Sequence, residues 1–585
     1  MTDTRWLLLL FALLFLPTQL AAQCGAPATS IPAVRAMSPD GFPTVTVEAV
    51  MTLDARGPDR LRGFFLQQPD NNPATVSKGL FVYTARDGGG EGRRVRLTAR
   101  VNDYQGRRQL SNVSQLKDCG PAPLPPAVPL TLPWADNQDL NAIEGMRVSF
   151  AQPLTVIDNY QLHRFGKLIL AAEPQLMPTQ VMPPGPAAAA LAAQQERHRI
   201  RLDDGRGQQY PDVIPYPPPA LRAENTVRAG DQVSNLDGIL DHRFGNWRIH
   251  PLHPPRFQAT NPRPDPIPRA ESSQLRIAAF NLENLFLGDE GFPTSRGARS
   301  PAELQRQLAK LTRTLQALDA DILPVMELEN NGTGTDSTVA RLAARLGEHW
   351  HWVRVQPPQH TGSDQIQVGM LYRRDRVTAL GTGDTLHQGP FSAGNRPALA
   401  QLFRHNDSGQ TLRVVVLHLK SKRCQRAQGA DRDQDDGQSC YARTRTRAAE
   451  TLAAWLSQLP KPEQFRGTLI TGDLNSYAQE TPLQVLHNAG YANMVSEFHG
   501  PEAHSYRFRG RAGTLDYLLA DQRLQPHVLA AQPWNINADE PPALGYSLAN
   551  KTRQQQRQLF TADPWRSSDH NPLIIDLGGF QGASD

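Results

Sequence analysis

The sequence has little cysteine, little net charge and no long apolar run beyond its amino-terminal segment. Only four of 585 residues are cysteines. They form no C-x-x-C pair, which argues against a structural zinc site. The formal net charge of +4 permits a polyanionic partner but does not require one. Hydrophobic residues make up 39% and charged residues 20%, as in ordinary globular proteins, and the length favours two to four domains.

The amino terminus has the pattern of a secretory signal. Arg5 precedes an apolar run from Trp6 to Leu16, and small residues up to Ala22 offer a cleavage site. A transmembrane anchor would need roughly 20 apolar residues, which is more than this run provides. The glutamine before Cys24 fits poorly with a lipoprotein signal. We therefore expect residues 1–22 to be a signal peptide and the mature protein to be secreted, either extracellular or periplasmic.

An oxidising compartment favours pairing of the four cysteines. Pairing Cys24 with Cys119 and Cys424 with Cys440 keeps each bridge inside one predicted domain. The second bridge closes a short loop, which contributes about 3 kcal/mol in the entropic description of disulfides.

The amino-terminal half is dominated by short β-type runs. Between residues 41 and 118 such runs alternate with turn-rich breaks, which predicts a small β-barrel module over residues 23–125. A second β-rich module is expected over residues 126–257, interrupted by an alanine-rich helix near residues 187–193. Proline-rich residues 258–271 are typical of a linker.

Residues 272–580 have a different character. Seven β-type runs alternate there with helical patterns, of which Pro301–Leu318 and Thr444–Leu459 are the clearest. This alternation predicts a layered α/β domain.

Polar side chains stand at the ends of most predicted strands of this last domain. Buried strands rarely end in such groups unless the groups are paired, hydrated or metal-bound. Each position alone could be an ordinary turn residue, but together they indicate one shared site. They are Asn281, Glu327, His418, Asp473 with Asn475, Asp516, and Asp569 with His570.

Four motifs occur in a characteristic order. They are Phe280-Asn281-Leu282-Glu283-Asn284, Asp321-Ile322-Leu323 leading to Glu327, Gly472-Asp473-Leu474-Asn475, and Ser568-Asp569-His570. In this combination the chain resembles the endonuclease/exonuclease/phosphatase superfamily, which includes pancreatic deoxyribonuclease and the abasic-site endonucleases, over about residues 275–577. It is similar in particular to bacterial secreted extracellular nucleases, in segments such as His418–Lys422 and Ile536–Glu540. The resemblance implies a four-layer α/β-sandwich catalytic domain preceded by one or two small β-barrel, OB-like modules.

The resemblance also implies a metal site. Asn281, Glu327 and Asp569 would hold Mg²⁺ or Mn²⁺, and carboxylate and amide oxygens are suited to these hard cations. A cation at this place would stabilise the charge that develops on a phosphodiester and lower the pKa of a bound water.

The remaining catalytic residues follow from the same resemblance. Asp473 and Asn475 would orient the attacking water and the phosphate. His570 would bridge or protonate a phosphate oxygen, or act as a base, with Asp516 holding its other ring nitrogen. His418 would protonate the leaving oxygen; abasic-site endonucleases have tyrosine there, so this histidine favours the general-nuclease branch.

Basic residues are expected to contact the substrate backbone. Arg396 matches an arginine that contacts phosphate in the deoxyribonucleases, and its planar fork suits phosphate oxygens. Lys420 and Lys422 add positive potential, although exposed lysines most often only aid solubility. Asp364 is the nearest candidate by pattern for a carboxylate that orients His418.

The loop between Cys424 and Cys440 contains alternating aspartates. Asp431, Asp433 and Asp435 are candidate ligands of a structural Ca²⁺. The spacing is not that of an EF-hand, and the alternative interpretation is a solvated acidic loop.

The sequence therefore predicts a secreted, metal-dependent nuclease, with DNA as the leading substrate, endonucleolytic action and little sequence preference. One alternative is a secreted hydrolase of lipids or small phosphoesters, similar to a sphingomyelinase, but no cluster of membrane-entering aromatic residues is evident. Another is an inactive DNA-binding protein, which is disfavoured because every expected metal and histidine position is filled.

Four aromatic residues of the amino-terminal module could stack on single-stranded nucleic acid. They are Phe64, Phe65, Phe81 and Tyr83. Their alternation suits core packing at least as well, and we expect about half of them to be core residues.

Overall fold

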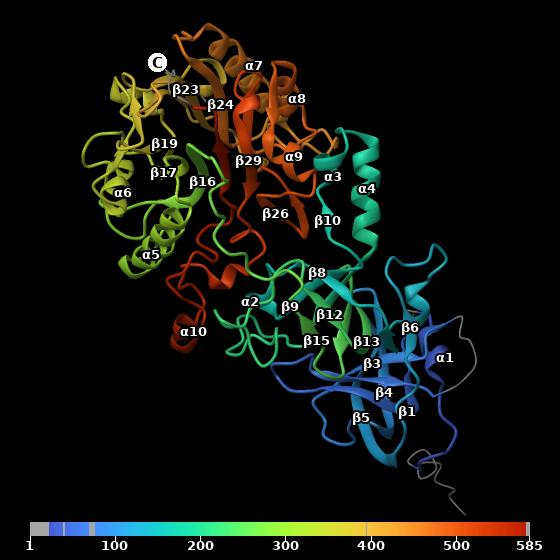
Figure 1. Ribbon diagram of the computed structural model, residues 1–585. Helices are drawn as coiled ribbons and strands as arrows, with labels where there is room; N and C mark the ends of the chain where they lie inside the picture. Colours follow the sequence, from blue (N-terminus) through green and yellow to red (C-terminus); the bar gives the residue numbers. More distant parts are fainter. Residues whose placement is uncertain (1–22, 39–40, 70–75, 393–394, 581–585) are drawn as a thin grey trace, which may run out of the picture. The chain divides into compact units, whose positions relative to one another are not determined.

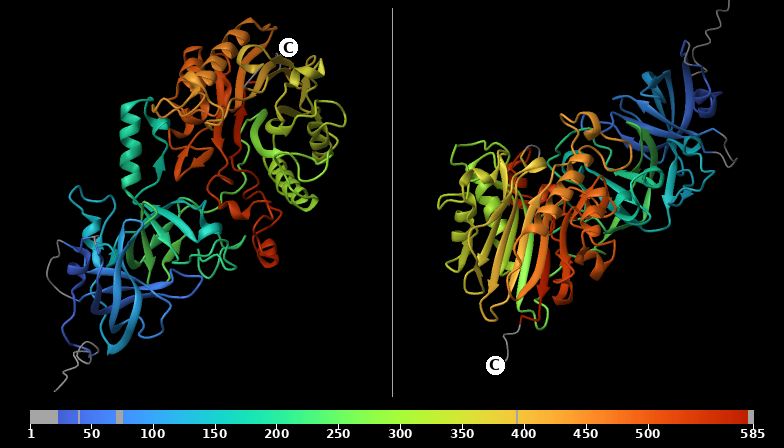
Figure 2. Two further views of the ribbon diagram at one scale, coloured as in Figure 1. Left: turned by 180° about the vertical axis from the view of Figure 1, so that it is seen from behind. Right: turned by 90° about the horizontal axis from the view of Figure 1, so that it is seen from above.

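The computed structural model describes residues 23–38, 41–69, 76–392 and 395–580, so the predicted signal peptide lies outside the described residues. The chain divides into two compact units (Figures 1 and 2). Unit 1 holds the described residues up to 152 together with 200–208 and 235–255, and unit 2 holds 153–199, 209–234 and 256 onward. The domain boundaries expected at residues 125, 257 and 271 stay predictions.

Unit 1 contains a closed barrel of five strands in the order β1-β2-β3-β5-β4. Strands β3 and β5 pair in parallel, and the pairs β1–β2, β1–β4, β2–β3 and β4–β5 are antiparallel. The first four strands coincide with the predicted runs, whereas β5 was missed because polar residues interrupt its apolar pattern. The strands are β1 (Thr44–Ala55), β2 (Gly63–Gln67), β3 (Gly79–Tyr83), β4 (Arg93–Tyr104) and β5 (Arg107–Pro121).

The aromatic residues of the barrel are mostly core. Phe64, Phe65 and Phe81 are at most 2% exposed, while Tyr83 is 46% exposed. Three of the four candidate stacking residues are therefore packed inside, and a base could reach Tyr83 alone among them.

Five neighbouring strands of a nine-stranded sheet also belong to unit 1, in the order β11-β14-β13-β7-β6. Its core includes an ionic network around Asp241, which is fully buried and accepts hydrogen bonds from Arg107 and Arg243. Such a carboxylate is tolerated in a core because it is paired. The strands are β6 (Val128–Leu130), β7 (Arg147–Phe150), β11 (Arg199–Asp203), β13 (Leu236–Arg243) and β14 (Asn246–Pro251).

Both predicted disulfides are present. Cys24 is joined to Cys119 in unit 1, and Cys424 to Cys440 in unit 2. None of the helices in the described part of the chain is long and apolar enough to cross a membrane.

Unit 2 begins with strands and short helices that precede its two large sheets. The predicted alanine-rich helix is α4 (Pro186–Arg197), which starts with proline at its first position, where no backbone donor is needed. The other elements are β8 (Leu154–Asp158), α2 (Leu162–Phe165), β9 (Lys167–Ala171), β10 (Gln175–Leu176), α3 (Pro178–Val181), β12 (Gln232–Ser234) and β15 (Arg256–Gln258).

Two sheets form the centre of unit 2. The first has the order β18-β19-β17-β16-β30-β29, and the second β20-β22-β23-β24-β28-β25, with β21 paired to β22. The first comprises β16 (Leu275–Leu285), β17 (Ile322–Glu329), β18 (Trp350–Trp352), β19 (Ile366–Arg373), β29 (Val528–Pro533) and β30 (Leu573–Leu577). The second comprises β20 (Val377–Ala379), β21 (Asp384–Leu386), β22 (Ala398–His405), β23 (Thr411–His418), β24 (Phe465–Asp473), β25 (Tyr491–Asn493) and β28 (Asp516–Asp521).

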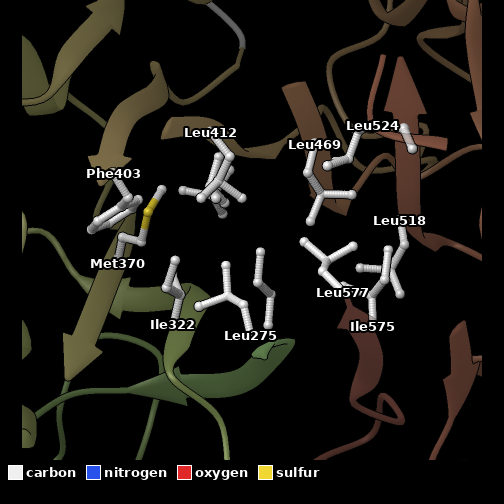
Figure 3. Close-up of a cluster of buried hydrophobic side chains, with 14 of the residues drawn as sticks. Leu275, Ile322, Met370, Phe403, Leu412, Leu469, Leu518, Leu524, Ile575 and Leu577 are labelled. Carbon is white, nitrogen blue, oxygen red and sulfur yellow. The ribbon is translucent and has the colours of Figure 1, made fainter. Parts of the chain in front are cut away.

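The two sheets pack face to face. Figure 3 shows the apolar cluster between them, to which Ile322 and Ile575 contribute from one sheet and Leu412 and Leu469 from the other. Helices α5 (Pro301–Ala317) and α6 (Thr338–Leu346) cover the outer face of the first sheet. Helices α7 (Ala442–Gln458) and α8 (Thr481–Asn488) cover that of the second. The layer order is helix, sheet, sheet, helix, and the predicted α/β class is confirmed.

Smaller elements complete unit 2 near the ends of these sheets. They are α9 (Met494–His499), β26 (Tyr506–Phe508), β27 (Arg511–Gly513) and α10 (Arg553–Gln558).

His163 in α2 should make unit 2 less stable in mild acid. Burial, followed by the nearby charge of Lys551, lowers the pKa of His163 from 6.5 to about 4. As the pH falls from about 6.5 to about 4, this histidine is protonated in the unfolded chain but stays neutral in the folded protein. The free energy of unfolding therefore decreases.

We expect His163→Phe, which keeps the ring contact with Tyr210, to reduce this loss by about 2 kcal/mol. Urea unfolding midpoints between pH 7 and pH 4 would measure it. If the stability of His163→Phe and of the unmodified protein depended equally on pH, His163 would not be the cause. The control is His349→Phe, which changes an exposed histidine.

Candidate active site

Strand register brings the predicted residues together. In the second sheet β23 runs parallel to β24, which pairs antiparallel with β28, and this pairing places His418, Asp473 and Asp516 in one row across three strands. In the first sheet Asn281 on β16 lies opposite the residue before Glu327 on β17. The site is therefore built on paired strands, which position side chains more rigidly than loops do.

Asp569 and His570 enter the site from the segment before β30. That strand pairs with β16, and the hydroxyl of Ser568 donates a hydrogen bond to the carbonyl of Asn281 at 2.7 Å. The charge of Asp569 acts on Glu327, where it helps to raise the pKa of the glutamate.

One carboxylate oxygen lies at the centre of these contacts. Oδ2 of Asp473 is 3.4 Å from Nδ2 of Asn281, 3.4 Å from Nε2 of His418 and 4.0 Å from Nε2 of His570. Asn281 Nδ2 also lies 3.3 Å from Oε1 of Glu327. Residues from both sheets thus share one small volume.

His570 is oriented by a second carboxylate. Its Nδ1 lies 2.7 Å from Oδ2 of Asp516, which leaves Nε2 directed toward Asp473. Nδ1 of His418 has no hydrogen-bond partner among the described residues. The two histidines therefore differ in whether a hydrogen bond at Nδ1 orients the ring.

The backbone is strained at two of the polar positions. Glu327 has a φ of 63°, beside a register shift in β17 between Val325 and Leu328. A bulge of this kind turns a side chain away from its regular direction. Asn475 has a φ of 47°, and its backbone N–H donates to Asp473 at 2.8 Å. Strained non-glycine residues concentrate at functional sites.

The site holds more buried negative charge than its neighbours neutralise. Burial raises the pKa of Glu327, with Asp569 as the next cause, and it raises the pKa of Asp473 to about 7. Burial and the charge of Asp569 raise the pKa of Glu283 to about 8. An added cation would relieve this repulsion.

The two histidines have pKa values shifted in opposite directions. Burial, followed by the charge of Arg396, holds the pKa of His418 well below its usual range. Burial also lowers the pKa of His570, but Asp516 and Asp569 more than offset it, so the pKa is raised well above its usual range. A pair of groups displaced in this way can divide acid and base roles.

Asp364 does not orient His418 as expected. Its carboxylate instead pairs with Arg396 at 3.3 Å and with Arg296 at 3.0 Å. The prediction failed because the loop that carries Asp364 packs against the arginines. The second guanidinium nitrogen of Arg396 donates to the carbonyl of Leu419 at 2.6 Å, directly after His418.

The two lysines after His418 have different surroundings. Nζ of Lys420 lies 5.1 Å from the ring centroid of Tyr441, the residue before α7. Lys422 instead forms an ion pair with buried Glu480 at 2.6 Å, so its charge is neutralised inside the protein.

The candidate calcium residues do not gather around one point. Both oxygens of Asp431 accept hydrogen bonds from Thr444 in the first turn of α7, and Asp433 accepts one from the backbone of Asp435. Within the described residues, the group of acidic and histidine side chains with metal-ligand spacing is Asp473, Asp516 and His570. The calcium prediction thus finds no support, because Asp431 caps a helix.

Three residues near the site were not assigned from the sequence. Glu283 stands inside a recognised motif, which is a signal that could have found it. The ring of Tyr506 lies 4.6 Å from that of His570, centroid to centroid, and Arg296 influences His418 electrostatically. Neither has a local sequence signal, because Tyr506 arrives on a short hairpin strand and Arg296 on a loop.

This arrangement of acids, an amide and two histidines at the ends of two stacked sheets is that of a phosphoester hydrolase. The family model "Endonuclease/Exonuclease/phosphatase family" matches residues 278–570, half of the sequence, and the chain belongs to this family. A second model, a domain of unknown function (DUF8508), matches residues 139–260.

Several solved structures match about half of this chain. An endonuclease/exonuclease/phosphatase from Bacteroides vulgatus is 15% identical, with a TM-score of 0.34, and the match covers 52% of this chain and 98% of that one. A mannosyl-6-phosphatase from Bacteroides thetaiotaomicron is 13% identical, with a TM-score of 0.34 and coverages of 52% and 99%. Danio rerio (D. rerio) TDP2 complexed with a single-strand DNA product is 15% identical, with a TM-score of 0.33 and coverages of 52% and 98%. No curated protein matches the chain.

Proposed function

We propose that the protein is a secreted, metal-dependent nuclease that hydrolyses phosphodiester bonds of extracellular nucleic acid, with DNA as the preferred substrate. Its action is endonucleolytic, with little sequence preference. The observation that supports this most is the approach of two histidines, His418 and His570, to one carboxylate, Asp473. Cleavage of a phosphodiester needs one group to activate water and another to protonate the leaving alkoxide.

The residues fit a divalent cation. Asn281, Glu327 and Asp569 supply oxygen donors, and the raised pKa values of Glu327 and Asp473 indicate that a positive charge would stabilise the site. Family members generally use divalent metals. A bound Mg²⁺ or Mn²⁺ would stabilise negative charge on the phosphate and lower the pKa of a bound water.

The protein groups divide the rest of the reaction. Asp473 and Asn475 hold the attacking water and a non-bridging phosphate oxygen. Asp516 fixes the tautomer of His570, so that Nε2 faces the reacting phosphate and exchanges a proton there. His418 forms a hydrogen bond to the leaving oxygen.

Positive charge near the site suits a polyanion. Arg396 is fixed between Asp364 and the carbonyl of Leu419, and the Lys420 ammonium is held near Tyr441. A guanidinium with one hydrogen bond to spare can still bind phosphate. Nε of Arg396 has no partner within the described residues.

The barrel of unit 1 supports the OB-like description. Its strand order β1-β2-β3-β5-β4 closes with one parallel pair, β3 with β5, and its core is filled by side chains. Two disulfides and the absence of a membrane-spanning helix in the described residues are compatible with secretion.

The purified protein should convert a supercoiled plasmid to nicked and linear forms when Mg²⁺ or Mn²⁺ is present. Chelation should abolish the reaction, because the buried carboxylates then lack their counter-charge. We expect His570→Ala to lower the rate at least about 1,000-fold.

His349→Ala, at an exposed histidine, is the matched control and should cleave at the normal rate. Absence of cleavage with every divalent ion would refute the nuclease proposal. Hydrolysis of sphingomyelin vesicles without plasmid cleavage would favour the lipid alternative.

A further inference from the structure

The β26–β27 hairpin lies beside the catalytic histidine and has no assigned role. Strands β26 and β27 pair antiparallel, with Tyr506 opposite Gly513 and Phe508 opposite Arg511. Strand β10 joins β27 in parallel and completes a three-stranded sheet. The first residue of β26, Tyr506, contacts the ring of His570 at 4.6 Å between centroids.

Phe508 lies on the same face of the hairpin as Tyr506. Alternate residues of a strand point to the same side, and they are separated by about 7 Å along it. Because Tyr506 faces His570, Phe508 continues that face outward from the catalytic residues. Its side chain is 48% exposed, which is unusual for a phenylalanine so close to a polar site.

One arginine lies beside the exposed ring, and a second stands opposite it in the hairpin. The guanidinium of Arg509 lies 5.2 Å from the ring centroid of Phe508, and Arg509 is exposed and forms no ion pair with any described residue. Arg511, across the hairpin from Phe508, donates to the side chain of Gln195 at 2.6 Å and to the carbonyl of Ala192 at 2.9 Å. The hairpin thus presents an aromatic face beside positive charge.

The hairpin is held in place by segments from elsewhere in unit 2. Strand β10 pairs with β27, and Figure 1 shows α4 next to β10. The backbone N–H of Met177 donates to the carbonyl of Ala512 at 2.8 Å, and Arg507 pairs with buried Asp539 at 2.5 Å. A ring presented on a fixed strand loses little conformational entropy when a ligand stacks on it. Both β10 and α4 lie within the stretch matched by the domain of unknown function, so bracing this hairpin is one task of that stretch.

We propose that Phe508, with Arg509 stacked beside it, is a platform for an unpaired nucleobase of the strand whose scissile phosphate lies at His570. The inference rests on the proposed nuclease function and names its preferred substrate as single-stranded nucleic acid, in which base faces are available. Stacking on an aromatic side chain tolerates any base, which suits an enzyme with little sequence preference. The arginine charge binds the adjoining phosphates.

The test uses the full-length protein and a fluorescent single-stranded DNA oligonucleotide. Phe508→Ala should raise KM about tenfold and leave kcat within about twofold, because one base-stacking contact is lost and the reacting groups are untouched. Phe508→Trp should restore KM. Phe498→Ala removes a ring of similar exposure, 45%, from α9 and should behave like the unmodified protein.

A second substrate separates stacking from a general effect on the site. On an oligonucleotide of equal length whose sugars lack bases, Phe508→Ala and the unmodified protein should have equal KM. Equal KM values for Phe508→Ala and Phe498→Ala on the normal oligonucleotide would overturn the platform.

Binding is measured independently of cleavage by fluorescence anisotropy in a His570→Ala background. A weaker affinity after adding Phe508→Ala supports the platform even if the unmodified protein fails to cleave. Failure to cleave or bind any oligonucleotide would refute both the platform and the nuclease function. If the protein cleaves and binds oligonucleotides and Phe508→Ala changes neither, the platform is refuted and the nuclease function is not.

Discussion

Replacement of Asp516 by asparagine should lower kcat for plasmid cleavage about 1,000-fold while the protein remains folded. Asp516 lies 2.7 Å from Nδ1 of His570 and is, after burial, the first cause of the histidine's pKa shift. The amide of asparagine has nearly the same shape but carries no charge, and its NH₂ group can face Nδ1. His570 would then lose its raised pKa and its fixed tautomer together. Initial rates of plasmid nicking at saturating Mg²⁺ measure the effect.

Asp521→Asn, at the other end of the same strand, is the matched control. Asp521 accepts hydrogen bonds from backbone groups of Thr468 and Leu524, away from the two histidines, so the rate should stay within about threefold. The double variant Asp516→Asn with His570→Ala should be no slower than His570→Ala alone, since the carboxylate acts through the histidine. Additive losses would show that Asp516 has a separate role.

Loss of the carboxylate of Asp539 should destabilise unit 2 by about 3 to 5 kcal/mol. Asp539 is fully buried and contacts Arg507 at 2.5 Å, His504 at 3.0 Å and Asn261 at 3.0 Å. Substitution by alanine would leave these donors buried without their acceptor. The charges of Arg507 and His504 overcome burial and hold the pKa of Asp539 well below its usual range.

The stabilisation has a defined pH dependence. Because the folded-state pKa is lowered, the contribution of Asp539 is complete above about pH 4, the unfolded value, and decreases as the pH falls further. At pH 7, Asp539→Ala should therefore unfold at a much lower urea concentration than the unmodified protein. In strong acid the difference between the two urea midpoints should become smaller. Asp289→Ala breaks an exposed ion pair with Arg341 and should change stability by less than about 1 kcal/mol. Equal effects of the two substitutions would contradict the assignment.

The acidic segment around Asp539 shows that a motif can be recognised in a sequence while its structural role is not. The segment can be singled out from the sequence, but the sequence does not reveal that Asp539 binds Arg507, which follows Tyr506 on β26. The carboxylate thereby anchors the hairpin that contacts His570. A charged residue chooses its partner through packing of distant segments, which no local pattern encodes.

The same limit applies to Asp364 and to the calcium candidate Asp431. Asp364 pairs with Arg396 and Arg296, and Asp431 caps α7 through Thr444. In each case the residue type was compatible with the expected role, and a different neighbour was closer. A carboxylate interacts with whichever donors the folded chain brings within hydrogen-bond distance.

The amino-acid sequence by itself determined the alternation of strands and helices, the two disulfides and the positions of the polar residues at strand ends. Those features depend on local periodicity and on motifs a few residues long. Only the tertiary structure decided that His418, Asp473 and Asp516 share one row, that Glu327 turns inward at a bulge, and that Tyr506 meets His570. These contacts join segments far apart in the chain, and their geometry is set by strand register and by the packing of two sheets.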